Sequence, residues 1–362
     1  MIKKLAPSIV LVKNRSTSLL LQFDSIGRIL YLGKNKKDLL NKIEVIDKFN
    51  KHASSDVLDK NDMIFSSWCD GADLEPMIKV EDSNGIYVNR FRVQSFKILN
   101  HYDHNFDGPH SRNKAQTLRV SYLDETKKIL VEQFISMHKD SDALVFSLKI
   151  TNLSLETLKI TKAMSVQLDF ASIDNTLFSL DGTWGRERNL TQTEVKTGIF
   201  SVKSSSGYSS NIHNPFVIVR NGNTYVSANL IYSGSHAETI EALPIGKSRF
   251  LSGLNSDVFS WTLEPQDSFA TPEAVICFGT SIDDVSLKMH GFVKKDIIRP
   301  EFLNMKPRVL LNSWEGIFFD FNRPKIIELA RKAKSIGVDL FVLDDGWFGK
   351  RDNDTSKCSF CT

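Results

Sequence analysis

One stretch near the C-terminal end constrains the fold of this chain more than any other. Between Arg308 and Arg351, two short apolar segments flank an amphipathic one. The apolar segments, Val309–Leu311 and Val338–Leu343, are typical of strands buried on both faces of a parallel sheet. The residues between them predict a helix, because apolar side chains recur there at spacings of three and four: Ile326, Leu329, Ala330, Ala333 and Ile336. A strand, a helix and a strand in this order form a right-handed βαβ unit.

The predicted helix carries start and stop signals in the sequence. Asn322 can cap its N-terminus, and Pro324 suits the first turn, where an amide hydrogen is not needed. Lys332 and Lys334 lie near its C-terminal end, where positive charge is favourable. Gly337 can adopt the left-handed conformation that ends many helices.

Polar and aromatic residues follow both predicted strands. They are Asn312, Trp314 and Glu315 after the first strand, and Asp344, Asp345, Gly346 and Trp347 after the second. Parallel α/β folds bind ligands at the carboxyl edge of the sheet. Carboxylates accept hydrogen bonds from hydroxyl groups, and an indole can cover the C–H face of a sugar ring. This combination favours a sugar site, although Asp-Asp-Gly by itself is equally typical of a simple turn.

Five segments carry a family resemblance. The sequences N-S-W-E-G, F-D-F-N and L-F-V-L-D-D-G-W-F-G-K-R resemble the start of the catalytic barrel in microbial α-galactosidases of glycoside hydrolase family 36. Upstream, Gly182–Arg188 (G-T-W-G-R-E-R) and Asn214–Phe216 (N-P-F) are similar to that family's N-terminal domain. The resemblance covers nearly the whole chain and is strong from about Ser165 onward. It implies a large β-super-sandwich followed by a (β/α)₈ barrel.

The resemblance also implies an activity. Enzymes of this family hydrolyse terminal α-galactosyl groups of melibiose- or raffinose-type oligosaccharides by a retaining double displacement, without a metal or an organic cofactor. It further implies that Asp344 and Asp345 bind galactose hydroxyls and that Trp314 lies at the side of the pocket. A second activity within the same broad family also stays possible at this point, namely that of a transglycosidase of the raffinose-synthase type rather than a hydrolase.

Two further residues are candidates in the N-terminal part. Glycines flank Trp184, so its loop can present the indole outward, and the resemblance implies that this tryptophan helps to wall the sugar pocket. The alternative is a tryptophan that plugs the interior of the sandwich. Asp47, within V-I-D-K-F, is similar to a place where the family's N-terminal domain supplies an aspartate to the sugar.

The first 280 residues are predicted to be mostly β structure. Alternation of apolar and polar residues is clear in Ala143–Asn152, and further strands are expected at Ser18–Phe23, Arg28–Leu32, Phe91–Leu99, Thr117–Leu123, Ile129–His138 and Thr157–Phe170. We therefore predict a mainly β fold: a large antiparallel β-sandwich (1–280), a linker helix and connection (281–307), and the truncated start of a (β/α)₈ barrel (308–362).

The sequence contains none of the stronger signals for other functions. A net charge of +3 is too small to indicate nucleic-acid binding. Three histidines in a polar loop (His101, His104 and His110) and the Cys358–Cys361 pair lack the spacing of a metal site. The apolar run at the N-terminus is too short for an export signal or a membrane span, so a cytoplasmic location is expected. The family resemblance implies a homo-oligomer.

We expect the 362-residue chain to be inactive when expressed alone. A (β/α)₈ barrel needs about 250 residues, and the resemblance places the nucleophile and the acid/base carboxylates on later strands. The family pattern also stops after Arg351, where residues 354–362 depart from it. An assay on an aryl α-galactoside should show no turnover above a heat-killed control, and clear turnover would contradict this expectation. The alternative function is a non-catalytic module for carbohydrate binding or subunit assembly.

Overall fold

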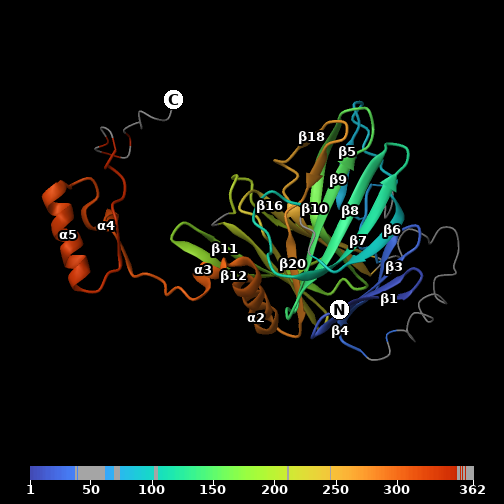
Figure 1. Ribbon diagram of the computed structural model, residues 1–362, viewed down its shortest axis with the longest axis horizontal. Helices are drawn as coiled ribbons and strands as arrows, with labels where there is room; N and C mark the ends of the chain where they lie inside the picture. The colour runs from blue at the N-terminus through green and yellow to red at the C-terminus, as the bar shows by residue number, and fades with distance from the viewer. Residues whose placement is uncertain are drawn as a thin grey trace. The chain divides into compact units, whose positions relative to one another are not determined.

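The computed structural model describes residues 1–36, 39, 62–68, 74–101, 105–209, 212–244, 246–348, 351, 353 and 355. The chain divides into two compact units, Met1–Ile298 (unit 1) and Arg299–Thr362 (unit 2). The described part of unit 1 consists largely of antiparallel strands, and that of unit 2 contains two parallel strands joined through a helix (Figure 1). This confirms the predicted mainly β fold class.

Unit 1 contains three sheets among its described residues. The four-stranded sheet consists of β1 (Ile2–Ala6), β2 (Ile9–Lys13), β3 (Thr17–Phe23) and β4 (Gly27–Lys34). The six-stranded sheet consists of β13 (Gly198–Lys203), β16 (His236–Leu243), β17 (Lys247–Leu254), β10 (Leu158–Phe170) and β18 (Trp261–Leu263), with β5 (Ile78–Glu81) also paired to β10.

The ten-stranded sheet is the largest of the three. In spatial order it consists of β12 (Arg186–Val195), β11 (Asn175–Thr183), β14 (His213–Asn221), β15 (Thr224–Leu230), β20 (Ala274–Gly279), β9 (Ala143–Asn152), β8 (Ile129–His138), β7 (Ala115–Asp124) and β6 (Arg92–Leu99), with β19 (Ser268–Ala270) also paired to β9.

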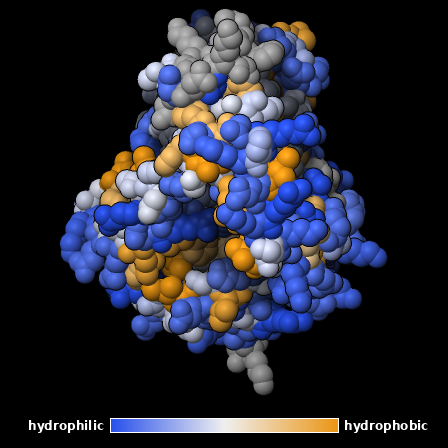
Figure 2. All heavy atoms as spheres, turned by 90° about the vertical axis from the view of Figure 1, so that its left-hand side faces the viewer, coloured by the Kyte–Doolittle hydropathy of each residue, from blue (hydrophilic) through white to orange (hydrophobic). Residues whose placement is uncertain are grey.

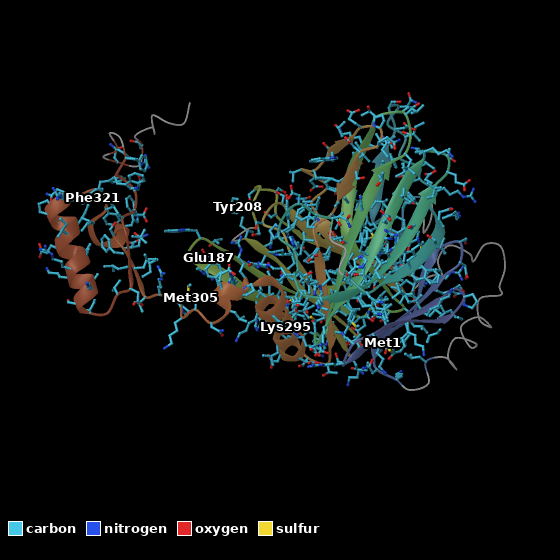
Figure 3. All side chains as sticks on the ribbon, viewed as in Figure 1. Met1, Glu187, Tyr208, Lys295, Met305 and Phe321 are labelled. Atoms are coloured by element: carbon cyan, nitrogen blue, oxygen red, sulfur yellow. The ribbon has the colours of Figure 1, made fainter. Side chains whose placement is uncertain are left out.

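The core of unit 1 follows from the two-residue period of its strands. In β9, Phe146, Leu148 and Ile150 are almost completely buried, whereas Ser147 and Lys149 between them are partly exposed. One continuous apolar cluster contains residues from all three sheets. Side chains fill the interior of this unit (Figure 3). The strands predicted at Ile129–His138 and Ala143–Asn152 are confirmed residue for residue.

A helix packs against the ten-stranded sheet at the end of unit 1. Helix α2 (Ile282–Phe292) begins after Ser281, whose side chain accepts a hydrogen bond from the Asp284 amide. Its buried side chains are Val285, Met289 and Phe292. The helix continues into a π-helical turn, η1 (Val293–Ile297), and helical geometry ends at Ile298. The short helix α3 (Pro300–Leu303) follows in unit 2.

Hydrogen bonds fix the π-helical turn to the sandwich. The Arg112 amide donates to the Asp296 carbonyl at 3.0 Å, and Asn113 Nδ2 donates to the Asp296 carboxylate at 2.9 Å. His138 Nδ1 lies 3.5 Å from the same carboxylate, and His138 Nε2 is 2.9 Å from Ser111 Oγ. Lys295, labelled in Figure 3, donates to the carbonyl of Lys139. Asp296 and His138 are buried, so this polar cluster holds the end of unit 1 from inside the fold.

Unit 2 contains the predicted strand–helix–strand arrangement. It consists of β21 (Leu310–Asn312), α4 (Trp314–Ile317), α5 (Arg323–Ser335) and β22 (Leu340–Val342). The two strands are parallel, with Leu310 opposite Leu340 and Asn312 opposite Val342. The Asn322 side chain caps α5 by accepting from the Lys325 amide, and Gly337 has a φ of 91°. The cap and stop signals read from the sequence are therefore confirmed.

The predicted burial of these two strands is wrong for this structure. Leu310 is 51% exposed and Leu340 is 37% exposed. Within the described residues each strand has one neighbouring strand, so one edge and part of each face stay uncovered. Hydrophobic side chains reach the molecular surface (Figure 2), and those of unit 2 include Val309, Phe318 and Ile336. No helix in the described part of the chain has the length and apolar character to cross a membrane.

Candidate functional site

The two strand ends of unit 2 meet at one edge of the small parallel sheet. Asn312 is opposite Val342 in the register, and the Ser313 amide donates to the Val342 carbonyl at 2.9 Å. The pairing therefore continues one residue beyond β21. It brings the residues that follow β21 beside Asp344 and Asp345, which follow β22. This is the juxtaposition that the βαβ pattern predicts.

Asn312 and Ser313 hold Asp344 in place. Asn312 Nδ2 donates to Asp344 Oδ2 at 2.5 Å, while Asn312 Oδ1 accepts from the Trp314 amide at 2.9 Å. Ser313 Oγ accepts from the Asp344 amide at 3.1 Å. One amide side chain thus links the carboxylate after the second strand to the backbone after the first. The sequence marked Asn312 as a polar residue at the strand end but gave no indication of this bridging contact.

Asp345 is paired with a cation. Arg351 Nε donates to Asp345 Oδ1 at 2.5 Å, and the Gly346 amide donates to the same oxygen at 2.7 Å. The hydrogen bond from the Arg351 guanidinium lowers the pKa of Asp345 below its ordinary value. The carboxyl group is therefore an anion at neutral pH, able to accept hydrogen bonds. No pattern in the sequence indicates this role for Arg351, because a contact between residues i and i+6 in a loop has no periodic signature.

Aromatic residues surround the strand ends. The Trp314 ring lies edge-on to Phe318 and Phe319, with ring centroids 5.3 and 4.9 Å apart. Gly346 has a φ of 92°, and a Cβ at this position would come within 2.9 Å of the Phe319 ring. Glycine is therefore required here by both backbone conformation and space. These contacts fix the turn that carries the two aspartates.

Trp184 lies in unit 1, at the turn between β11 and β12. Its side chain is 86% exposed, and the following Gly185 has a φ of 75°. The interpretation of this tryptophan as a plug in the sandwich is therefore wrong, because the glycine-assisted turn directs the indole to solvent. Asp47 lies outside the described residues.

The described residues contain no group of three or more His, Cys, Asp or Glu side chains arranged to hold a metal ion. In the polar loop, His101 and His110 are described, and His104 is not. Cys358 and Cys361 also lie outside the described residues, and Cys277 is a buried free thiol. The unit 2 site thus offers two anchored carboxylates, an amide and an indole. Such groups bind a polyhydroxylated ligand through acceptors and an apolar ring face.

Comparisons with known proteins match both parts of the chain. The family model described as "Glycosyl hydrolase family 36 N-terminal domain" matches residues 27–264, and the model described as "Melibiase" matches residues 268–359. α-Galactosidase C of Emericella nidulans is 34% identical over 78% of this chain and 39% of its own length. α-Galactosidase Mel36A of Lactobacillus acidophilus is 29% identical over 95% of this chain and 50% of its own length.

Solved structures give the same result for the fold. The α-galactosidase AgaA of Geobacillus stearothermophilus superimposes with a TM-score of 0.89 at 27% identity, over 96% of this chain and 51% of that chain. The galactosidase domain of AgaSK superimposes with a TM-score of 0.90 at 26% identity, over 98% and 52% of the two chains. The chain thus spans about two fifths to half of the length of the relatives described here.

Proposed function

This chain belongs to glycosyl hydrolase family 36, and from that membership we propose that its residues form part of an α-galactosidase. The proposed substrates are oligosaccharides with terminal α-galactosyl groups. Variants of the related AgaA have been crystallised in complex with raffinose and with stachyose, which supports this substrate class. The proposed reaction is a retaining double displacement that needs two carboxylates about 5–5.5 Å apart. We assign neither of them to a residue of this chain.

The observation that carries the proposal is the geometry of the strand ends in unit 2. Asp345 is ionised and oriented by Arg351, and Asp344 is oriented by Asn312. The two aspartates are adjacent in sequence, but their side chains bond to different partners. Together they can therefore accept hydrogen bonds from two hydroxyl groups. We assign them to galactose binding and Trp314 to the pocket wall. They are not assigned to the chemical step.

Residues of unit 1 complete the proposal. The exposed indole of Trp184 is available to a sugar or to another subunit, and Asp47 is assigned to a sugar contact by family resemblance alone. We propose that 1–280 acts as the sandwich domain, 281–307 as the connection and 308–362 as the start of the barrel. A homo-oligomer in which neighbouring copies share sugar contacts is part of this proposal.

A segment exchange tests the site. Residues Arg308–Arg351 replace the corresponding segment of AgaA, whose fold matches this chain. The exchanged enzyme should retain activity on raffinose within about tenfold, because the two chains share the same fold over nearly all of this chain. In this background Asp345→Asn should reduce kcat/KM at least about tenfold, since hydrogen bonds to a charged group contribute about 1.5–3 kcal/mol.

Asp320→Asn provides the matched control within the same segment. Asp320 is an exposed carboxylate that forms an ion pair with Lys325. It is not among the residues assigned to sugar binding. Its replacement should change kcat/KM less than twofold. A correctly folded exchanged enzyme, shown by an unchanged melting temperature, that fails to hydrolyse raffinose would contradict the assignment of these strand ends. Equal losses for Asp345→Asn and Asp320→Asn would contradict the specific role of Asp345.

A further inference from the structure

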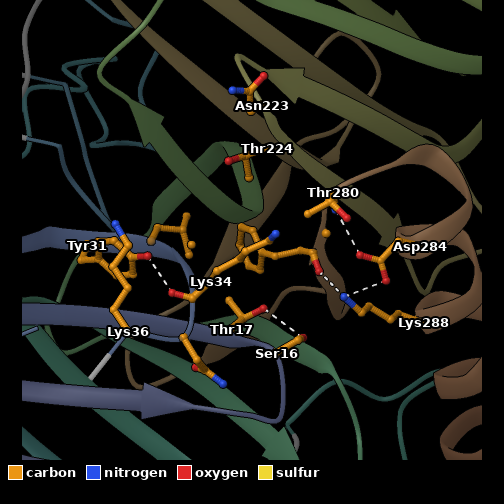
Figure 4. Close-up of a pocket in the computed structure, with 15 residues that line it drawn as sticks. Ser16, Thr17, Tyr31, Lys34, Lys36, Asn223, Thr224, Thr280, Asp284 and Lys288 are labelled. Carbon is orange, nitrogen blue, oxygen red and sulfur yellow. Dashed lines mark hydrogen bonds and ion pairs between the residues drawn. The ribbon is translucent and has the colours of Figure 1, made fainter. Parts of the chain in front are cut away.

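Unit 1 contains pockets of its own that the proposed activity does not use. In the pocket of about 670 Å³ drawn in Figure 4, Lys288 lies 2.9 Å from Asp284 and donates to the Phe278 carbonyl at 2.8 Å, so this charged pair is satisfied within the protein. A second pocket, of about 490 Å³, contains a charged pair that is not in direct contact. Its volume is within the range of about 300–1,000 Å³ that is common for small-molecule sites.

Three neighbouring strands of the ten-stranded sheet contribute side chains to this second pocket. Glu194 in β12 is opposite Thr176 in β11, and Thr176 is opposite Arg220 in β14. Directly opposed residues point to the same face of a sheet, so these three side chains form a row. Arg220 Nη2 donates to Thr176 Oγ1 at 2.7 Å, and Thr176 is fully buried. The strand pairing and this hydrogen bond therefore fix the guanidinium.

The carboxylate beside this guanidinium comes from the segment before β11. The Asp174 amide donates to Ser172 Oγ at 3.1 Å, and the Asp174 carbonyl accepts from the Gly222 amide at 3.2 Å. Gly222 lies in the turn between β14 and β15 and has a φ of 54°. These contacts hold the Asp174 backbone, and Asp174 Oδ1 lies 4.0 Å from Arg220 Nη2.

The gap between Arg220 and Asp174 indicates a ligand. A distance of 4.0 Å is too long for a hydrogen bond, and the two side chains are 35% and 69% exposed. Among the described residues the guanidinium donates only to Thr176, and the Asp174 carboxylate accepts no hydrogen bond. Two hydrogen bonds of about 2.8–2.9 Å that meet at a right angle on one oxygen atom span about 4 Å. A hydroxyl group both accepts and donates, so one hydroxyl can accept from Arg220 and donate to Asp174.

The charges in the lining are balanced. The ionisable side chains there are Asp174, Glu194, Lys196 and Arg220. Glu194 and Lys196 form an ion pair at 3.2 Å, and Arg220 and Asp174 are the other two charges. A ligand with a net charge would meet as many like as opposite charges. A neutral ligand with several hydroxyl groups can use the donors and the acceptors alike.

We propose that this pocket binds a neutral sugar through adjacent hydroxyl groups. One hydroxyl bridges Arg220 and Asp174, and its neighbour accepts from a second guanidinium nitrogen. Ile173, which is 38% exposed, contacts C–H groups of the ring, and Thr197 adds a hydroxyl to the lining. The nine residues of β11 span about 27 Å, so this site lies at the opposite end of that strand from Trp184. It is an additional site of unit 1 and does not depend on the proposed activity.

NMR of the isoleucine δ1 methyl groups in the 362-residue chain tests the proposal, with galactose as the probe. Ile173 reports on this pocket, and Ile317 in α4 reports on the strand ends of unit 2. The substitutions Ile173→Val and Ile317→Val, made one at a time, assign the two resonances. The Ile173 signal should shift saturably with a Kd on the order of 10 mM, since little binding energy remains after the cost of association. The two reporters separate a failure of this site from a failure of the proposed galactose site.

Charged analogues of galactose test the balance of charge in the pocket. Galacturonate carries a negative charge and galactosamine a positive one on the same ring. Neither should bind more than about threefold tighter than galactose, because each meets like and opposite charges together. Raising the salt concentration should leave the binding of galactose unchanged.

Substitutions test the two bridging side chains. Arg220→Met and Asp174→Ala should each weaken galactose binding at Ile173 at least about fivefold, since each removes one partner of the bridging hydroxyl. Arg220→Lys keeps the charge without the planar pair of donors and should weaken binding as well. Arg331→Met, at an exposed position in α5, is the matched control and should leave binding unchanged. The remaining isoleucine methyl signals show whether each variant is folded.

Four outcomes would overturn the proposal. The absence of a saturable shift at Ile173 would mean that water alone occupies the gap between Arg220 and Asp174. Binding of either charged analogue more than about threefold tighter than galactose would indicate a site for ions. Equal weakening by Arg220→Met and Arg331→Met would show an effect of overall charge. Full binding by Arg220→Lys would show that the paired donors of the guanidinium are not needed.

Discussion

Replacing Arg249 with methionine should lower the free energy of unfolding of unit 1 by about 3–5 kcal/mol. Arg249 is 1% exposed, and its guanidinium forms two hydrogen bonds with Asp169, at 2.7 and 2.8 Å. A third guanidinium nitrogen donates to Ser66 Oγ and to the Glu75 carbonyl. The substitution leaves the Asp169 carboxylate buried without its cation, which is the costly part of breaking such a pair.

Urea unfolding followed by circular dichroism measures this loss. The double variant Arg249→Met with Asp169→Leu should recover most of the stability, because an apolar pair of similar volume removes both buried charges. Lys196→Met serves as the matched control, since Lys196 forms an exposed ion pair with Glu194 and should contribute less than about 1 kcal/mol. A loss below about 1 kcal/mol for Arg249→Met alone would contradict the prediction.

The buried pair also shows what kind of contact joins distant segments of unit 1. Arg249 in β17 is opposite Asp169 in β10, and it reaches Ser66 and Glu75, which precede β5. None of these partners is close in sequence, so no local pattern reveals them. The sequence of Thr157–Phe170 predicts the strand β10, but it does not predict that Asp169 in this strand forms a buried charged pair.

The elements of unit 2 could be predicted because their signals are local. Asn322, Pro324 and Gly337 determine where α5 begins and ends through contacts within one turn. Parallel pairing then places Asp344 and Asp345 beside Asn312 at the same edge. The amide–carboxylate bridge from Asn312 and the ion pair with Arg351 depend on side-chain conformations in the folded loop, so the sequence did not reveal them.

Other differences arise from tertiary context. The strand at Leu310–Asn312 is apolar enough for burial but has a single neighbouring strand among the described residues. Leu287 in α2 is apolar but 70% exposed, because Val285, Met289 and Phe292 define the face of the helix that packs against the sheet. The assignment of a reaction came from the family resemblance, since two adjacent aspartates after a strand are compatible with many ligands.

Replacing Glu273 with glutamine should raise the free energy of unfolding of unit 1 at alkaline pH and change it little at pH 5. Glu273 is 2% exposed, and its Oε2 accepts from the Ser111 amide at 2.7 Å. Its other oxygen, Oε1, is buried and has no hydrogen-bond partner among the described residues. Burial raises the pKa of Glu273 to about 8, although the Ser111 hydrogen bond partly opposes the shift.

The sign of the pH dependence follows from this raised pKa. Below the unfolded pKa of about 4.5 the carboxyl group is protonated in both states, so its stabilising contribution is fully present. Between about pH 4.5 and 8 the unfolded chain loses the proton while the folded protein retains it, and stability decreases by about 1.4 kcal/mol per pH unit. The total loss above pH 8 is therefore about 3–5 kcal/mol.

Glu273→Gln removes this titration and keeps an acceptor for the Ser111 amide. Urea unfolding of both proteins from pH 5 to pH 9 should give a stability difference that grows in favour of the variant and levels off above about pH 8. Glu194→Gln, at an exposed position, is the matched control for the same substitution outside the core. A flat difference for Glu273→Gln would mean that Glu273 has an ordinary pKa in the folded protein.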